Sequence, residues 1–191
     1  MKLLIALAIA LAPASDGISA FAGGRVKSPD GAWSVWAAAT NEDANEVAVA
    51  RLNGPGVKNR ELMRFARSID VVWPSEPGRV MLVQRTEHFA TLYVFTLGAA
   101  ETGSDWLQSD IERAMAARWP RLASIENRRI AFGRQGGATC VLVEETGLPA
   151  GRAAGSVDAR RGAFRLDLAA KRAMPVRGCL GARIDAAAAE R

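Results

Sequence analysis

Residues 68–97, SIDVVWPSEPGRVMLVQRTEHFATLYVFTL, decide the fold of this chain. The stretch contains three runs of β-branched, aromatic and aliphatic residues, at positions 69–73, 80–86 and 90–97. The turn formers PSEPG separate the first two runs, and Glu87 and His88 mark the second break. Runs of this composition between turn-forming residues are typical of β-strands joined by tight turns. The stretch therefore predicts a three-stranded antiparallel meander around which the other segments pack.

Strand patterns lie on both sides of this meander. They cover residues 32–40, 46–52, 62–65, 127–134, 138–145, 162–168 and 174–179. In the sixth segment Phe164, Leu166 and Leu168 alternate with charged residues, which predicts a strand with one buried face. Residues 133–137 are rich in glycine but lead into a strand pattern, so we interpret them as a hairpin turn and not as a phosphate-binding loop.

One amphipathic helix is expected between the two groups of strands. Its apolar positions recur every four residues, at Leu107, Ile111, Met115 and Trp119. Such spacing places them on one helical face. Ser104 or Ser109 can cap the start, and Ser109 with Glu112 fits a capping box. Pro120 ends the helix, which we expect to lie across the open face of the sheet.

Two turns along the chain have similar sequences. SPDGAWSV at residues 28–35 aligns with SEPGRVML at residues 75–82, and Trp73 precedes the second copy. The first turn resembles the S-P-D-G turn of TolB-like and WD40-like β-propeller repeats, in which it joins two antiparallel strands of a blade. The resemblance implies two blade-like meanders over residues 27–97. A closed propeller needs about four blades, and no third copy follows, so we predict no ring.

The N-terminus has the pattern of an export signal. Lys2 supplies a positive charge, and residues 3–12 form an unbroken apolar run. This run is shorter than the roughly 20 residues that a membrane-spanning helix needs, and small residues follow it. We expect cleavage near Ala20 or Ala22, giving a periplasmic or secreted protein that is not an integral membrane protein. The alternative is a hydrophobic N-terminal strand or helix in the core.

The two cysteines suit an oxidising compartment. Cys140 lies in an apolar run and Cys179 lies near the C-terminus. An even count in an exported chain favours a disulfide. Closing a loop of this length stabilises the fold by about 4 kcal/mol on the chain-entropy model. Two buried free thiols are the alternative.

The predicted architecture is mostly β (α+β), with antiparallel meanders resembling two propeller blades, one helix packed on the sheet, and C-terminal strands. Residues 1–22 form the signal and residues 23–100 the two blade-like meanders. Residues 101–191 supply the helix and the last strands, in one continuous globular unit with the meanders. A short helical tail is expected over residues 186–191.

The sequence contains no recognised catalytic arrangement. His88 is the single histidine and is expected at an exposed hairpin tip, which removes the usual base for a nucleophile. Asp30 and Glu76 are interpreted as turn formers. Glu144 and Glu145 are adjacent and so face opposite sides of a strand. We therefore predict no catalytic, cofactor-binding or metal-binding residues, and lean against an enzyme.

Three function classes remain. The first is an exported, soluble, non-catalytic binding protein that uses a sheet face, an open edge or its loops, with an envelope protein as the expected kind of partner. The second is an exported hydrolase-like enzyme of unrecognised type. The third is a polyanion or envelope-surface binder that uses arginines. The chain has a net charge of +5, but its arginines are scattered along the sequence, which argues against nucleic acid.

The tryptophans are candidate anchors for contact. Most of the five are expected to be buried. Trp33 and Trp36 are the possible contact residues. They stand at i and i+3 on a strand, so that one faces the core and the other faces solvent.

Overall fold

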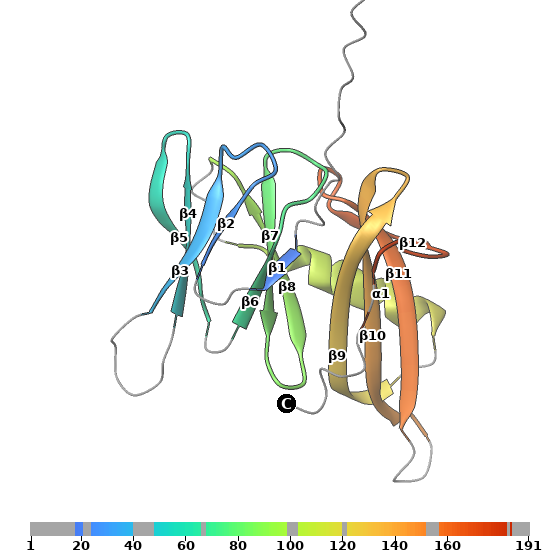
Figure 1. Ribbon diagram of the computed structural model, residues 1–191. Helices are drawn as coiled ribbons and strands as arrows, with labels where there is room; N and C mark the ends of the chain where they lie inside the picture. Colours follow the sequence, from blue (N-terminus) through green and yellow to red (C-terminus); the bar gives the residue numbers. More distant parts are fainter. Residues whose placement is uncertain are drawn as a thin grey trace, which may run out of the picture.

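The computed structural model describes residues 18–20, 24–39, 48–65, 68–98, 103–119, 122–151, 157–182 and 184. These residues form three four-stranded antiparallel sheets and one helix, with no closed barrel or propeller among them (Figure 1). The predicted mostly β fold is therefore confirmed. The signal run over residues 3–12, the loop at 41–45 and the tail at 186–191 lie outside the described residues.

The first sheet, which we call the N-terminal sheet, has the strand order β2-β3-β4-β5. Its strands are β2 (Arg25–Lys27), β3 (Ser34–Ala39), β4 (Ala48–Gly54) and β5 (Val57–Phe65). The SPDG turn joins β2 to β3. Ser28 closes this turn through its backbone N–H, which donates to the Trp33 carbonyl at 2.9 Å. Strand β5 begins earlier than expected, because a Gly56 turn with positive φ returns the chain directly from β4.

The second sheet, the middle sheet, contains the meander that opened the sequence analysis. It has the order β1-β6-β7-β8, with β1 (Ile18–Ala20), β6 (Ser68–Val72), β7 (Arg79–Arg85) and β8 (Ala90–Thr96). All three predicted strands of the meander are confirmed. Strand β1 lies within the segment assigned to the signal, where it pairs with β6 in the register Ile18 to Val72.

The third sheet, the C-terminal sheet, is a meander in sequence order. It comprises β9 (Leu122–Gln135), β10 (Ala138–Pro149), β11 (Asp158–Asp167) and β12 (Arg172–Val176). Strands β9 and β10 run further than predicted, since β9 begins at Leu122 and not at residue 127, and β10 continues to Pro149, past residue 145. The pairing continues because register shifts at Thr146/Gly147 and Leu148/Pro149 absorb the glycine and proline. The expected hairpin turn is confirmed at Gly136 and Gly137, both with positive φ.

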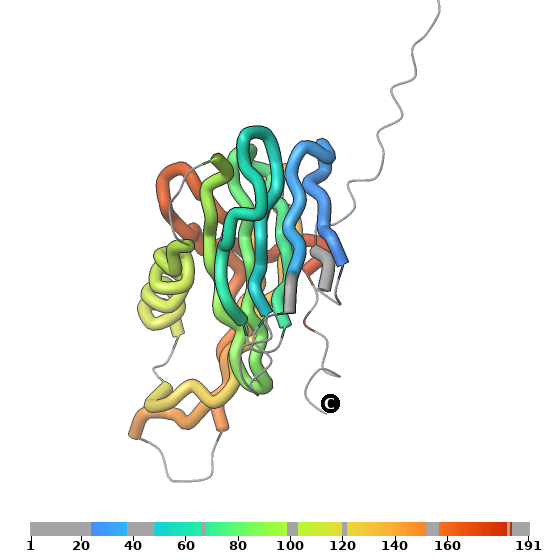
Figure 2. The backbone as a smooth tube through the Cα atoms, turned by 90° about the vertical axis from the view of Figure 1, so that its left-hand side faces the viewer, coloured from blue at the N-terminus to red at the C-terminus, as the bar shows by residue number. Residues whose placement is uncertain are grey.

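The helix α1 (Trp106–Arg118) packs against both the middle and the C-terminal sheet (Figure 1), and it lies on one side of them in Figure 2. The expected capping box is wrong. The N-cap is Asp105 without a side-chain cap, and the Ser104 hydroxyl accepts from the Trp106 N–H at 3.4 Å. Ser109 lies inside the helix, because the helix must begin early enough to bury Leu107 completely.

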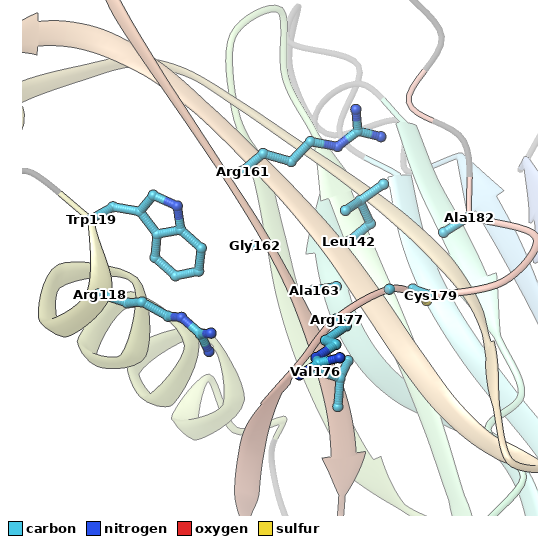
Figure 3. A pocket seen from close by; sticks show the side chains of 11 residues that line it. Arg118, Trp119, Leu142, Arg161, Gly162, Ala163, Val176, Arg177, Cys179 and Ala182 are labelled. Carbon is cyan, nitrogen blue, oxygen red and sulfur yellow. The ribbon is translucent and has the colours of Figure 1, made fainter.

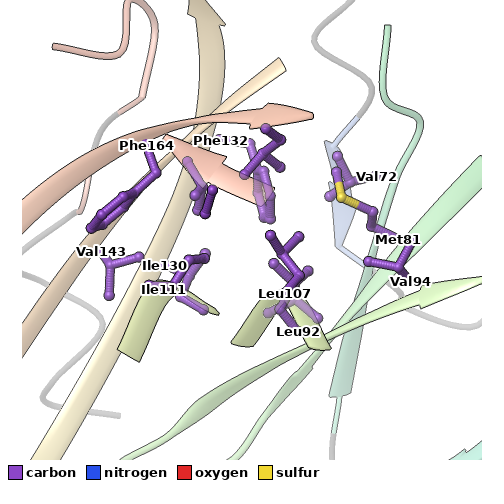
Figure 4. Close-up of a cluster of buried hydrophobic side chains, with 14 of the residues drawn as sticks. Val72, Met81, Leu92, Val94, Leu107, Ile111, Ile130, Phe132, Val143 and Phe164 are labelled. Atoms are coloured by element: carbon purple, nitrogen blue, oxygen red, sulfur yellow. The ribbon is translucent and has the colours of Figure 1, made fainter. Parts of the chain in front are cut away.

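Both faces of the middle sheet are buried. Along β7, Val80 and Leu82 pack toward the N-terminal sheet, whereas Met81 and Val83 pack toward the helix and the C-terminal sheet. This follows from the period of two in strand side chains, because an uninterrupted apolar run supplies two apolar faces. Figure 4 shows the second of these clusters, in which Leu107 and Ile111 of the helix lie among Leu92, Ile130 and Val143.

Candidate functional site

The tryptophans named as possible contacts do not form a pair. Trp33 is half-buried in the cluster between the N-terminal and middle sheets, where it fills the space over Gly54. Trp36 lies on the opposite face, since its neighbours Val35 and Ala37 point into that cluster. Trp73 is buried, and the remaining four tryptophans are half-buried. The expectation that most are buried thus holds for Trp73 alone, because the large indole often keeps an exposed edge.

The carboxylates considered for acid–base work are held by other groups. Asp30 accepts the Ala32 N–H at 3.0 Å and the Ser28 hydroxyl, and these hydrogen bonds, led by that of Ser28, lower the pKa of this exposed carboxyl. Asp30 is therefore a turn former, as predicted. Glu76 also lies in a turn, between β6 and β7, and its carboxylate in addition accepts the backbone N–H of Leu168 at 3.0 and 3.1 Å, which links two sheets.

Glu145 is fully buried in a row of charges across the C-terminal sheet. It stands in register between Arg128 of β9 and Arg160 of β11. Its Oε1 accepts from Arg128 Nε at 2.7 Å and its Oε2 from Arg160 Nε at 2.6 Å. Glu112 of α1 pairs with Arg128 at 2.7 Å, which fastens the helix to the sheet. Glu144 faces the other way, as expected. The row is structural, because every charge in it has a partner.

His88 lies at the exposed tip of the β7–β8 hairpin, as expected. Its Nε2 is 3.9 Å from Glu87 Oε1, and both side chains are more than half exposed. Its backbone carbonyl accepts the Arg128 N–H at 2.8 Å. Within the described residues, no group of three or more histidines, cysteines, aspartates or glutamates could hold a metal ion.

A cavity of about 470 Å³ opens between the end of α1 and the C-terminal sheet (Figure 3). Its apolar floor is one cross-strand row, formed by Leu142 of β10, Ala163 of β11 and Val176 of β12. Trp119 closes the side next to the helix. We call this cavity the arginine pocket, because its other prominent side chains are Arg118, Arg161 and Arg177.

The arginine pocket carries uncompensated positive charge. No acidic residue lines it. None of its three guanidinium groups has a hydrogen-bond or ion-pair partner among the described residues. The Arg118 guanidinium lies over the Trp119 ring, at 5.7 Å from the centroid. Glu144 stands opposite Arg161 in the sheet register, but no ion pair joins them. Guanidinium groups bind carboxylates and phosphates through paired hydrogen bonds, so the arrangement suits an anion with an apolar part.

The C-terminal segment builds the far wall of the pocket. The predicted disulfide is confirmed between Cys140 and Cys179, with a Cα–Cα distance of 5.7 Å. Beyond it, Leu180 forms an antiparallel bridge with Arg134. This approach requires Gly133, since a Cβ there would lie 2.1 Å from the Leu180 carbonyl oxygen. The disulfide therefore fixes Arg177 and Gly178, which follow β12, against the sheet.

Sequence reasoning did not find this site. The three arginines are far apart along the chain, and Trp119 was interpreted as a core residue of the helix. The one signal in the sequence is that Arg118 and Trp119 stand next to each other just before Pro120. This position places a cation and an indole together at the end of the helix. Strand β12 also ends at Val176, earlier than the predicted residue 179, which leaves Arg177 free to face the pocket.

No family model, curated protein or solved structure matches this chain. The helix of the described residues is too short and too polar to cross a membrane.

Proposed function

We propose that the protein is an exported, non-catalytic binding protein that holds an acidic ligand in the arginine pocket. The observation that carries this proposal is three unpartnered guanidinium groups around a cavity with an apolar floor. In most folded proteins, neighbouring cations are separated or paired with acids, because like charges repel. A bound anion would supply the missing partners of Arg118, Arg161 and Arg177.

The pocket has the size and composition of a ligand site. Its volume lies within the range of about 300 to 1,000 Å³ that is usual for such sites. Trp119 and the floor row provide an apolar surface, and the guanidinium groups provide orientation. The disulfide and the charge row around Glu145 hold the sheet and the helix end in place, so the ligand meets a preformed surface. Export, inferred from the N-terminal pattern, would place this surface outside the cytoplasm.

Calorimetric titration with citrate and with pyrophosphate tests the proposal. The double variant Arg161→Ala/Arg177→Ala should weaken binding by about tenfold or more, equivalent to about 1.4 kcal/mol. The matched control is Arg165→Ala/Arg172→Ala, which removes the same charge from exposed positions of the same sheet outside the pocket. The control should change affinity by less than about twofold at about 0.15 M salt, where long-range charge effects are screened. Equal losses in both variants, or no binding of either anion, would overturn the proposal.

A further inference from the structure

One edge of β11 is only partly covered. On one side, β10 pairs with residues 158–165 of this strand. On the other side, β12 pairs with residues 163–167 alone. Among the described residues, the first half of β11 therefore has a neighbouring strand on one side only. Arg161, Gly162 and Ala163 of this strand also line the arginine pocket, so the uncovered edge leads into the cavity.

The register shows which backbone groups face the uncovered edge. Phe164 stands opposite Pro175, which has no N–H, so these two residues form a non-hydrogen-bonded pair. In an antiparallel ladder, hydrogen-bonded and non-hydrogen-bonded pairs alternate. Ala163 therefore directs its backbone N–H and carbonyl toward β12, and Ala159 and Arg161 direct theirs to the same side, beyond the end of β12. No backbone hydrogen bond reaches them from any other described segment.

The end of α1 stands beside this edge. Gly162 permits the close approach, since a Cβ there would lie 2.6 Å from Met115 Sδ. The helix continues through Arg118 to Trp119, which faces the strand across the pocket in Figure 3. A free edge in a water-exposed sheet is normally covered or otherwise protected against pairing with other chains. Here it opens between cationic side chains and an indole.

We propose that the uncovered edge of β11 accepts an acidic peptide segment as an additional β-strand. The proposal rests on the proposed function, because it names the ligand of the same pocket. The backbone of the peptide would exchange hydrogen bonds with Ala159 and Arg161. Its carboxylates would pair with the pocket residues Arg161 and Arg177. Main-chain hydrogen bonds supply affinity in strand addition, and alternate side chains supply specificity.

Strand geometry predicts the pattern of the peptide. Side chains of an added strand alternate between the two faces of the sheet. Those on the face of Leu142 and Ala163 meet Arg161, and those on the other face meet Trp119 at the helix end. The preferred segment therefore alternates acidic and apolar residues over about five positions, or about 17 Å of extended chain.

Titration with a capped peptide of sequence ELELE tests the proposal. Two comparison peptides have the same sequence with N-methyl groups on alternate backbone nitrogens, one on the odd-numbered and one on the even-numbered residues. Both keep the charge, and one of them lacks the N–H donors that would face the edge. We expect the peptide whose N-methyl groups replace the donors facing the edge to bind about tenfold more weakly.

Hydrogen exchange provides a second readout. Exchange at the Ala159 and Arg161 amides should slow on binding by a similar factor, whereas the already bonded Ala163 amide should not change. The variant Ala159→Pro removes one edge donor without touching the ladder to β10, and should also weaken binding.

The outcomes separate the two proposals. If ELELE and both N-methylated forms bind equally and all depend on Arg161 and Arg177, the strand-addition proposal is overturned while the anion pocket stands. If neither peptide nor inorganic anion binds, both are overturned. Amides of Ala159 and Arg161 that are already protected in the free protein would show that another part of the chain fills the edge, which also overturns strand addition.

Discussion

The two faces of the middle sheet are closed in different ways. Toward the N-terminal sheet, the interface is a cluster of buried apolar side chains, among them Leu52, Ile69 and Leu82. Among the described residues, a polar link across it is Arg60 Nη2, which donates to the Thr96 carbonyl at 3.0 Å. The Nε and Nη1 atoms of Arg60 are buried without partners, and this burial lowers the pKa of its guanidinium.

Toward the C-terminal sheet, directional bonds accompany the apolar cluster. Ser75 and Thr139 exchange hydrogen bonds, with N–H to hydroxyl distances of 2.8 and 2.9 Å. Arg85 Nη2 donates to the Ile130 carbonyl at 3.1 Å. The Glu76–Leu168 and His88–Arg128 bonds add further links between the same two sheets.

The two kinds of contact, apolar burial and directional hydrogen bonds, have different structural effects. Apolar burial is non-directional and contributes roughly in proportion to the area removed from water. It stabilises the contact of two sheets but sets their relative position only through packing. Hydrogen bonds have strict distance and angle requirements. The interface that carries them is the one that positions the C-terminal sheet and α1, and with them the arginine pocket.

The largest expected effect follows from breaking the charge row across the C-terminal sheet. Glu145→Ala leaves Arg128 and Arg160 buried without their shared carboxylate, and should lower the free energy of unfolding by about 4 kcal/mol. Urea unfolding measures this. The matched control is Glu144→Ala, one position along the strand on the other face, which should cost less than about 1 kcal/mol. A loss below that value in Glu145→Ala would show that the row is hydrated and contributes little.

A smaller loss of unfolding free energy is expected at the apolar interface between the N-terminal and middle sheets. Leu82→Ala removes a fully buried side chain between the N-terminal and middle sheets and should cost about 3 kcal/mol in urea unfolding. Leu148→Ala is the control, because that side chain is 38% exposed. The pocket is lined by the end of α1, the C-terminal sheet and the segment after β12, so citrate affinity of the folded Leu82→Ala protein should not change. A changed affinity would show that the two interfaces are coupled.

The smallest effect is expected at Arg60. Arg60→Met keeps the long apolar stem, loses one hydrogen bond and removes two buried donors without partners. These terms nearly cancel, since a hydrogen bond and an unsatisfied buried group are each worth about 1 kcal/mol. Unfolding free energy should remain within about 1 kcal/mol of the parent protein. Arg60→Ala, which also loses the stem packing, should be less stable than Arg60→Met. A larger loss in Arg60→Met would show that the bond to Thr96 holds this interface in place.

Much of the fold could be predicted because it depends on local patterns. The meander of β6, β7 and β8, the amphipathic stripe of α1 and the turn at Gly136 and Gly137 all follow from periodicity and turn chemistry. The errors occurred at boundaries. The true start of α1 depends on burying Leu107, and the length of β10 depends on its partner β9, so that neither end is encoded locally.

The arginine pocket could not be predicted. Arg118, Arg161 and Arg177 belong to a helix end, a strand and the segment after β12, and nothing in their spacing signals proximity. Glu76 illustrates the same limit, because its role as a link to Leu168 requires the C-terminal sheet to stand beside its turn.

The sequence by itself determined most strands, the helix and the hairpin turns, because hydrophobic period and turn formers act over short distances. The even cysteine count favoured the disulfide. Tertiary structure alone decided which charges are neutralised and which remain free. Glu145 meets two arginines because three strands align in register. The pocket arginines meet no acid among the described residues, because β12 ends early and the helix stops beside it.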